Sequence, residues 1–208
     1  METIFAETVD LELVADLCAI GIKRKPLTPR NYEKWHVSNL IDSAKLISRG
    51  DVRYSGDNEV PPSIRALGHI GRIWESAIDC YLAYYAVQKG GVYVPDMEQE
   101  KDGILGSLDG IMILPELGVL VCETKLKFSL HGEIPLRDLQ QTRAYCYLAD
   151  TDLVCYVSGH LSSAPPTARA EMRVFRFTQQ SIKETWEMLV NTRDYLIKCG
   201  AFCGVSVK

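Results

Sequence analysis

The chain has 208 residues, of which 47% are hydrophobic and 24% are charged, and its formal net charge at pH 7 is −4. These values are typical of one soluble domain with a substantial core, and they argue against a surface that attracts DNA uniformly. No window is apolar over the length of a membrane span, the acidic start differs from a signal peptide, and the seven cysteines are an odd number. We therefore expect a cytoplasmic protein with reduced thiols and no membrane partner.

The charges are unevenly distributed along the chain. Between residues 21 and 72, ten basic residues outnumber five acidic ones, so the remainder of the chain is strongly acidic. A basic N-terminal third is compatible with binding along a phosphate backbone. Scattered, solvated Lys and Arg side chains explain the same pattern equally well.

Helices are expected in the first part of the chain. Apolar residues at helical spacing mark 7–20, a Thr-Pro start and a Gly stop bound 28–50, and the longest apolar stripe runs over 61–88. A polar loop at 51–60 separates the last two. We expect a single domain with a helical N-terminal region, residues 1–60, and a core formed by residues 61–208.

Strands dominate the second part. The expected elements are a strand at 92–94, a polar turn at 95–102, a hairpin of strands 110–114 and 119–126, a loop at 128–134, a helix at 135–149, a strand at 152–158, a loop at 162–170, a strand at 171–177 and a helix at 179–198. This order predicts an α/β fold, with a central mixed β-sheet flanked by α-helices.

The hairpin carries charged residues where apolar ones are expected. Side chains alternate across a strand, so Glu123 and Lys125 share one face with Val119 and Val121. Burying a charge on such a face is costly, and Asp109, before the partner strand, can bring a second carboxylate to the same place. Two carboxylates beside an ammonium suit a hard divalent cation and a phosphodiester.

Four short motifs occur in a recognisable order. Gly106-Ser-Leu-Asp109 followed by Glu123-Thr-Lys125 resembles the Asp…Glu-x-Lys core of the PD-(D/E)XK nuclease superfamily. Gly71-Arg-Ile-Trp-Glu75 is similar to that superfamily's helical Glu motif. Gln141-Thr-Arg-Ala-Tyr145 is similar to the Gln-x-x-x-Tyr motif of the RecB and lambda-exonuclease branch. The resemblance spans residues 68–147 and implies a restriction-endonuclease-like core.

The resemblance also implies roles for individual residues. Mg²⁺ or Mn²⁺ would be held by the side chains of Glu75, Asp109 and Glu123 and by the backbone carbonyl of Thr124. Lys125 would hold the attacking water and offset charge on the scissile phosphate, with support from Gln141. The residues expected to contact substrate are Tyr145, Arg72 and His131.

Several alternatives to these roles remain open. Glu75 could be a surface residue paired with Arg72 or Lys89, and Glu123 and Lys125 could form only a structural ion pair. Gln140 would replace Gln141 if the helix phase were shifted by one residue, and Asp102 would replace Asp109. His69 is expected to be structural, and Cys199 and Cys203 are too few for an iron–sulfur or zinc site.

The function implied by the resemblance is a divalent-metal-dependent DNA nuclease. The Glu and Gln-x-x-x-Tyr motifs favour an exonuclease acting on linear duplex or single-stranded ends, in recombination, repair or degradation of DNA, as in phages. An endonuclease of the same fold, or an inactive nucleic-acid-binding or assembly module, are the alternatives. Lambda-type relatives close into rings, so a homo-oligomer is compatible with the resemblance.

Overall fold

The computed structural model describes residues 1–19, 34–54, 62–127, 133–163 and 166–201. Its elements, in chain order, are β1 (Glu2–Thr8), α1 (Leu11–Ala19), β2 (Trp35–His36), α2 (Val37–Ile47), α3 (Pro62–Gln88), β3 (Val92–Lys101), β4 (Ile104–Leu114), β5 (Gly118–Lys127), α4 (Leu136–Ala149), β6 (Leu153–Ser163), β7 (Pro166–Arg176) and α5 (Gln179–Lys198). Among the described residues, no helix is long and apolar enough to cross a membrane.

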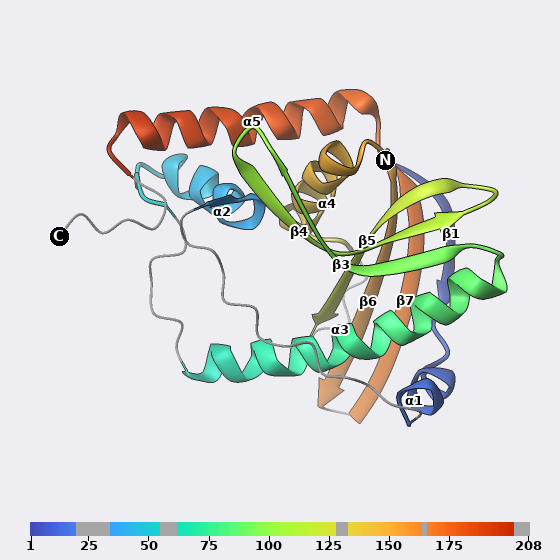
Figure 1. Ribbon diagram of the computed structural model, residues 1–208. Coiled ribbons are helices and arrows are strands. Elements are labelled where there is room, and N and C mark those ends of the chain that lie inside the picture. Colours follow the sequence, from blue (N-terminus) through green and yellow to red (C-terminus); the bar gives the residue numbers. More distant parts are fainter. Residues whose placement is uncertain (20–33, 55–61, 128–132, 164–165, 202–208) are drawn as a thin grey trace.

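One mixed sheet organises these elements. Its strand order is β1-β7-β6-β5-β4-β2, and β3 also pairs with β4. The β5–β6 and β2–β4 pairs are parallel, and the remaining pairs are antiparallel. Helices α1 and α3 lie on one face of the sheet, and α2, α4 and α5 lie on the other (Figure 1). The predicted α/β fold, a central mixed sheet flanked by helices, is confirmed.

Each face of the sheet carries its own hydrophobic core, because successive side chains of a strand point to opposite faces. Val121 of β5 packs in the core beneath α4 and α5, together with Trp186. Its neighbour Cys122 packs in the core beneath α1 and α3, together with Ile78. The residues of β5 that follow Val121 in alternation therefore face α4.

The long elements agree with the sequence. Helix α5 has the predicted bounds, α3 and α4 each begin one residue after the predicted start, and the central hairpin is formed by β4 and β5. Ile78 and Tyr81 of the predicted α3 stripe are buried, and Trp74 and Tyr85 pack against them. These elements have strong periodicity, which tertiary contacts reinforce.

The N-terminal region is not wholly helical. Residues 2–8 form β1, which pairs with β7 at the edge of the sheet. Helix α1 begins only at Leu11. Asp10 caps it by accepting hydrogen bonds from the backbone N–H groups of Glu12 and Leu13, at 3.0 and 3.1 Å. Trp35, expected within a helix, lies in β2 and pairs with β4. A mostly exposed edge strand and a two-residue strand carry little apolar signal, so periodicity did not indicate them.

Two predicted loops are also shorter in the structure. The polar segment 95–102 belongs almost entirely to β3, which pairs with β4 up to Lys101↔Ile104. Pro95 gives this segment the sequence signature of a turn, but the chain continues through it as a strand whose pairing with β4 keeps one register. Similarly, β7 begins at Pro166, inside the predicted loop 162–170.

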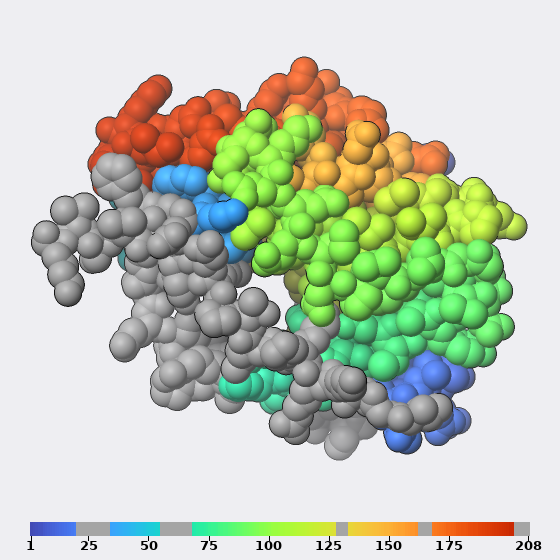
Figure 2. All heavy atoms as spheres, viewed as in Figure 1, coloured from blue at the N-terminus to red at the C-terminus, as the bar shows by residue number. Residues whose placement is uncertain are grey.

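The turn between β3 and β4 anchors this hairpin to α5. Asp102 and Gly103 both have positive φ, at +51° and +70°, as a two-residue type I′ turn requires. The Asp102 carboxylate accepts a hydrogen bond from Trp186 Nε1 at 2.9 Å, and its backbone carbonyl accepts one from Arg193. The space-filling view shows this light-green hairpin lying against α5 in red (Figure 2). The contact fixes β4, and with it Asp109, relative to the helical layer.

Candidate active site

The candidate site lies where β4 and β5 stop pairing. Their antiparallel ladder ends at the pair Gly110↔Cys122. Beyond this pair β5 continues alongside β6, whereas β4 continues alongside β3. The two strands therefore separate, and we call this point, with the side chains of Asp109, Glu123 and Lys125, the fork.

Asp109 bridges the two arms of the fork. Its Oδ2 accepts hydrogen bonds from the backbone N–H of Thr124 at 2.7 Å and from the Thr124 hydroxyl at 3.0 Å. The carboxylate thus supplies an acceptor to β5 where the ladder with β4 has ended. Both contacts use the same oxygen, so the orientation of the carboxylate is fixed while Oδ1 is not used by them.

Glu123 is the most unusual residue of the fork. Its side chain is 0% exposed, and Oε2 has no hydrogen-bond partner among the described residues. Burial, together with the nearby carboxylate of Asp109, raises the pKa of Glu123 to about 8, although Lys125 acts in the opposite direction. An orphaned oxygen on a buried carboxylate is costly, so this position is held ready for a cation or proton.

Lys125 supplies the positive charge at the fork. Its ammonium donates a hydrogen bond to Glu123 Oε1, and its side chain is 27% exposed. Burial alone would lower the pKa of Lys125, but the carboxylates of Glu123 and Asp109 raise it above its ordinary value. Lys125 therefore keeps its proton at physiological pH and presents hydrogen-bond donors to the fork.

Gln141 and Tyr145 approach the fork from α4. Gln141 Nε2 donates to the Tyr145 hydroxyl at 2.9 Å, and its Oε1 accepts from Arg137 at 3.4 Å. Arg137 in turn donates two hydrogen bonds of 2.8 Å to the carboxylate of Asp42 on α2. Burial raises the pKa of Tyr145, and the charges of Glu123 and Asp109 raise it further, whereas Lys125 acts in the opposite direction.

A glycine lets α4 come this close to β4. A Cβ at Gly106 would lie 2.4 Å from a methyl carbon of Leu148 and 3.1 Å from the ring of Tyr145. A side chain at this position would require the Leu148 methyl group to move and the Tyr145 ring to give way by a few tenths of an ångström. The Gly of the Gly-Ser-Leu-Asp motif thus has a packing role, because it allows Tyr145 to reach the fork.

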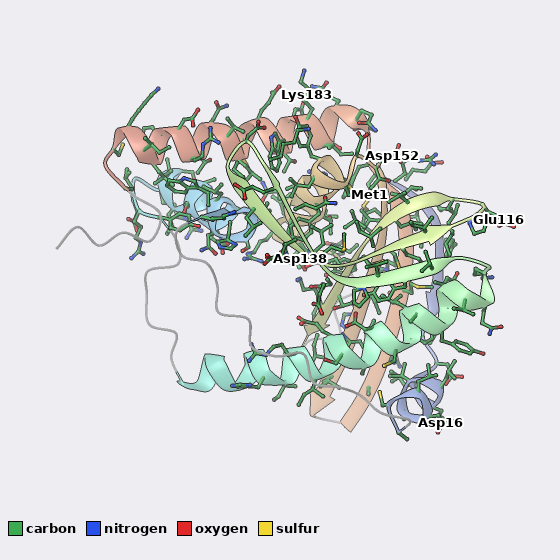
Figure 3. All side chains as sticks on the ribbon, in the orientation of Figure 1. Met1, Asp16, Glu116, Asp138, Asp152 and Lys183 are labelled. Carbon is green, nitrogen blue, oxygen red and sulfur yellow. The ribbon has the colours of Figure 1, made fainter. Side chains whose placement is uncertain are left out.

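The sequence did not indicate a second group of charges next to the fork. Asp138 of α4 is 7% exposed and accepts a hydrogen bond from the Tyr156 hydroxyl at 2.8 Å, and Lys127 Nζ lies 3.7 Å from the same oxygen. Figure 3 shows Asp138 in the interior, whereas Asp16 and Lys183 project outward. A signal was present, since a second Lys follows Lys125 on the same face of the strand and an Asp precedes Gln141 by three helical positions.

The remaining predicted residues lie in different surroundings. Glu75 is half-buried on α3. Among the described residues, however, no group of three or more His, Cys, Asp and Glu side chains is arranged to hold a metal ion, so Glu75 is not brought into a shared cluster with the fork. A guanidinium nitrogen of Arg72 lies 3.0 Å from Nδ1 of His69. His131 lies outside the described residues.

The donor set of the fork nevertheless suits Mg²⁺ or Mn²⁺. Mg²⁺ is usually bound by one or two carboxylates, with water and substrate phosphate completing its shell, so a cluster of three protein ligands is not required. Asp109 and Glu123 supply two carboxylates, and Glu123 Oε2 is a buried oxygen without a partner among the described residues. The residues present therefore fit a hard divalent cation.

Two alternatives from the sequence can be compared with the structure. Asp102 lies at the hairpin tip, where its carboxylate accepts a hydrogen bond from Trp186. It is not part of the fork and so does not replace Asp109. Gln140 lies beside Met188, at 3.7 Å from its sulfur, whereas Gln141 contacts Tyr145. Helix phase thus places Gln141 toward the fork.

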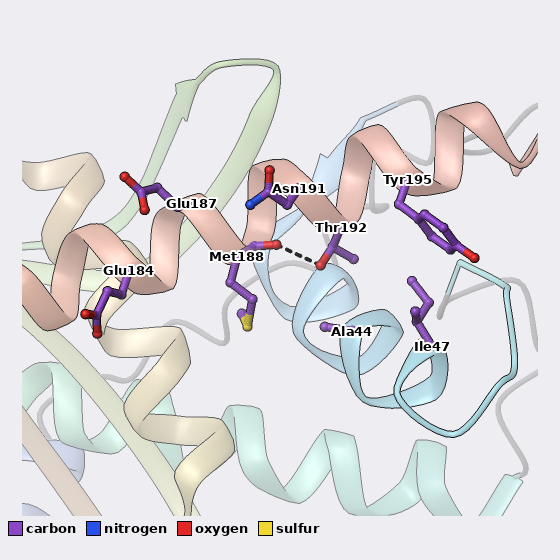
Figure 4. A pocket seen from close by; sticks show the side chains of 8 residues that line it. All are labelled: Ala44, Ile47, Glu184, Glu187, Met188, Asn191, Thr192 and Tyr195. Atoms are coloured by element: carbon purple, nitrogen blue, oxygen red, sulfur yellow. Dashed lines mark hydrogen bonds between the residues drawn. The ribbon is translucent and has the colours of Figure 1, made fainter.

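The fork does not coincide with the pocket between α2 and α5. That pocket has a volume of about 480 Å³. It is lined by Ala44, Ile47, Glu184, Glu187, Met188, Asn191, Thr192 and Tyr195 (Figure 4). None of these side chains belongs to the predicted site. The pocket is therefore a gap between two packed helices and shares no residue with the fork.

The chain shares its α/β fold with a solved exonuclease structure. The alkaline exonuclease LHK-Exo in complex with dAMP has a TM-score of 0.50 to this chain and 12% identity, over 80% of this chain and 89% of that one. LHK-Exo from Laribacter hongkongensis without that ligand gives 0.49, also at 12% identity and the same coverage. A phage-related exonuclease from Haemophilus somnus 129PT gives 0.43 and 14% identity, over 79% and 83%. No protein-family model and no curated protein sequence matches the chain.

Proposed function

We propose that this protein is a divalent-metal-dependent nuclease that hydrolyses phosphodiester bonds in DNA. The observation that carries the proposal is the fork, where a buried Glu123 with an unpartnered oxygen lies beside Asp109 and the protonated Lys125. The fold it shares with LHK-Exo, an exonuclease that binds dAMP in its crystal structure, supports a nucleotide-containing substrate.

In the proposed reaction the residues of the fork position a metal, a water and a phosphate. Asp109 and Glu123 would hold Mg²⁺ or Mn²⁺ together with the Thr124 carbonyl, and the bound metal supplies Lewis-acid stabilisation of charge on the phosphoryl oxygens. Thr124 keeps the Asp109 carboxylate in orientation through its N–H and hydroxyl. Lys125, protonated and anchored by Glu123, donates hydrogen bonds to the attacking water or to a phosphate oxygen.

Residues of α4 support this arrangement. The hydrogen bond between Gln141 and Tyr145 holds both side chains against the fork, and Arg137 fixes the other end of the Gln141 amide. We assign Gln141 to orienting Lys125 and the scissile phosphate, and Tyr145, which is 3% exposed, to holding the Gln141 amide; a contact of Tyr145 with substrate remains a prediction. Glu75, Arg72 and His131 remain predictions as a further ligand and as substrate contacts.

We infer an exonuclease in preference to an endonuclease, on the strength of the Glu75 and Gln141–Tyr145 motifs and of the LHK-Exo fold. The test is to incubate the purified protein with linear duplex, linear single-stranded and circular DNA, in Mg²⁺, in Mn²⁺ and in EDTA. We expect loss of linear DNA in either metal and none in EDTA. Nicking of circles would replace exonuclease with endonuclease, and binding without cleavage in every condition would indicate an inactive nucleic-acid-binding module.

A further inference from the structure

A row of basic side chains crosses the sheet next to the fork. Lys127 of β5 pairs with His160 of β6, and His160 pairs with Arg169 of β7. Register partners point to the same face and neighbouring strands are about 4.8 Å apart, so the three side chains form one line. We call Lys127, His160 and Arg169 the basic row. It starts two residues after Lys125, or about 6.6 Å further along the same strand face.

The basic row begins beside α4, where Lys127 contacts Asp138, and runs across β6 to β7. In Figure 1 the ends of β6 and β7 nearest their connection extend well beyond α4 and α5. Arg169 is exposed, and the Lys127 side chain is 16% exposed. A cavity of about 510 Å³ is lined by His160 and Arg169 together with residues of β1 and β7. Solvent, and therefore a ligand, can reach Arg169 and part of the Lys127 side chain, whereas His160 between them is buried, at 8% exposure.

The acidic residues near the basic row are already engaged. Asp138 lies 3.7 Å from Lys127 Nζ, but the same Asp138 oxygen accepts the closer hydrogen bond from Tyr156, at 2.8 Å. The ammonium of Lys127 has three donors, and among the described residues it makes this long ion pair and lies 5.3 Å from the centre of the Tyr156 ring, contacts that do not use all three. His160 is held by Ser158, whose hydroxyl lies 3.1 Å from His160 Nε2.

Two glutamates also line the cavity. Glu171 is paired with Arg173 at 2.6 Å, so its charge is balanced within β7. Glu7 contributes to raising the pKa of Tyr81 and Tyr85, which face α1 and α3, so it acts mainly on the opposite side of the sheet. The face that carries the basic row consequently keeps a surplus of positive charge.

We propose that the basic row binds phosphates of the nucleic-acid strand that flanks the scissile bond, so that the strand leaves the fork across β5, β6 and β7. The proposal rests on the proposed nuclease function. The guanidinium of Arg169 provides a planar set of N–H donors that suits a phosphate. Lys127 provides a point charge beside the site of cleavage. Each occupied position would release counterions from the strand.

The test measures the salt dependence of DNA binding in EDTA. The dissociation constant of a fluorescent single-stranded oligonucleotide is determined over a series of KCl concentrations for the wild type and for Lys127→Gln/Arg169→Gln. One phosphate contact on a single strand contributes about 0.7 to the slope of log K against log salt, so losing two should reduce the slope by about 1.4. The matched control is Arg176→Gln/Lys183→Gln, which removes the same charge from positions outside the row, and its slope should equal that of the wild type.

The outcomes separate this proposal from the nuclease assignment. If the wild type cleaves DNA but the basic-row variant keeps the slope of the control, the basic row is overturned and the nuclease stands. If the wild type neither binds nor cleaves DNA, both proposals fail. Lys127→Arg/Arg169→Lys, which keeps both charges, should retain the wild-type slope, and thermal melting checks that each variant is folded. Excess dAMP that abolishes the difference in slope would show a site for a free nucleotide and overturn the proposed strand path.

Discussion

Asp102 and Asp109 lie on the same stretch of chain, yet their surroundings are opposite in kind. At the hairpin tip, the Asp102 side chain accepts from Trp186 and its carbonyl accepts from Arg193, so the protein itself completes the contacts. At the fork, Asp109 lies beside Glu123, whose buried Oε2 is left without a partner among the described residues. A carboxylate whose bonds are complete within the protein holds the structure together, whereas an incompletely satisfied, buried one is held ready for a ligand.

Strand pairing explains the difference. The tip is a two-residue turn between paired strands, and its carboxylate is free to bond to a neighbouring helix. At the fork the two strands separate, so no backbone partner from β4 faces β5 there. The Asp109 side chain accepts the hydrogen bond from the Thr124 backbone N–H instead. If the tip is structural and the fork functional, substitutions at the tip should change stability and substitutions at the fork should change cleavage.

The largest effect is expected on cleavage. Asp109→Asn and Lys125→Met should each reduce the rate by about 100-fold or more, because each removes a charge at the reacting phosphate. Asparagine retains an oxygen that can accept from Thr124, so the fold should persist. Asp102→Asn is the matched control and should cleave at the wild-type rate. Equal losses in all three variants, accompanied by lower melting temperatures, would contradict the contrast between tip and fork.

The next effect concerns pH and the metal-free protein. Glu123 has a pKa of about 8 in the folded state against an ordinary 4.5, so between these values the folded chain binds a proton that the unfolded chain has lost. The free energy of unfolding should therefore fall as pH rises through this window, by at most about 1.4 kcal/mol per pH unit from this one group. The raised pKa of Lys125 lies above the window and does not offset the fall.

Urea unfolding in EDTA at a series of pH values measures this dependence. Glu123→Gln does not titrate and should give a flatter curve than the wild type, whereas Asp102→Asn should follow the wild-type curve. Parallel curves for the wild type and Glu123→Gln would show that Glu123 is ionised in the folded protein throughout the window.

A smaller effect is expected on α4. Gln141→Leu should reduce cleavage about 10-fold, the lower end for a residue that orients a catalytic group, because it removes the contacts to Tyr145 and Arg137. Gln140→Leu, one position earlier on the same helix, should leave the rate unchanged. Reversed results would mean that Gln140 supports the fork, as the alternative helix phase proposed.

The smallest effect is expected at the tip. Trp186→Phe should lower the free energy of unfolding by about 1 kcal/mol, the net value of one hydrogen bond, and Asp102→Ala by more, because alanine is also disfavoured at the positive φ of this turn position; both should retain cleavage. Phenylalanine can still stack on Tyr147, whose ring lies 4.6 Å from that of Trp186. Because the two changes remove the same bond, the double variant should cost less than their sum, and strict additivity would argue against the contact.

The elements that could be predicted from the sequence were those marked by a local pattern of apolar residues. Strong periodicity fixed α3 and α5, and simple alternation along β5 placed Glu123 and Lys125 on one face. The two-residue spacing of a strand is a local rule that burial then enforces. Two strands were not predicted in full because their sequence patterns are weak. β1 is an exposed edge strand, and Pro95 gives part of the paired strand β3 the sequence signature of a turn.

The sequence by itself determined the α/β order of the elements and the kinds of residue available for the site, because element order and the Asp…Glu-x-Lys spacing are properties of consecutive residues. Only the tertiary structure decided which of them meet. The separation of β4 from β5 joined Asp109 to Thr124, Glu75 was left outside a shared cluster among the described residues, and strand register aligned Lys127, His160 and Arg169 across three strands. The physical reason is that pairing register and strand divergence depend on contacts between segments far apart in the chain, which no local period encodes.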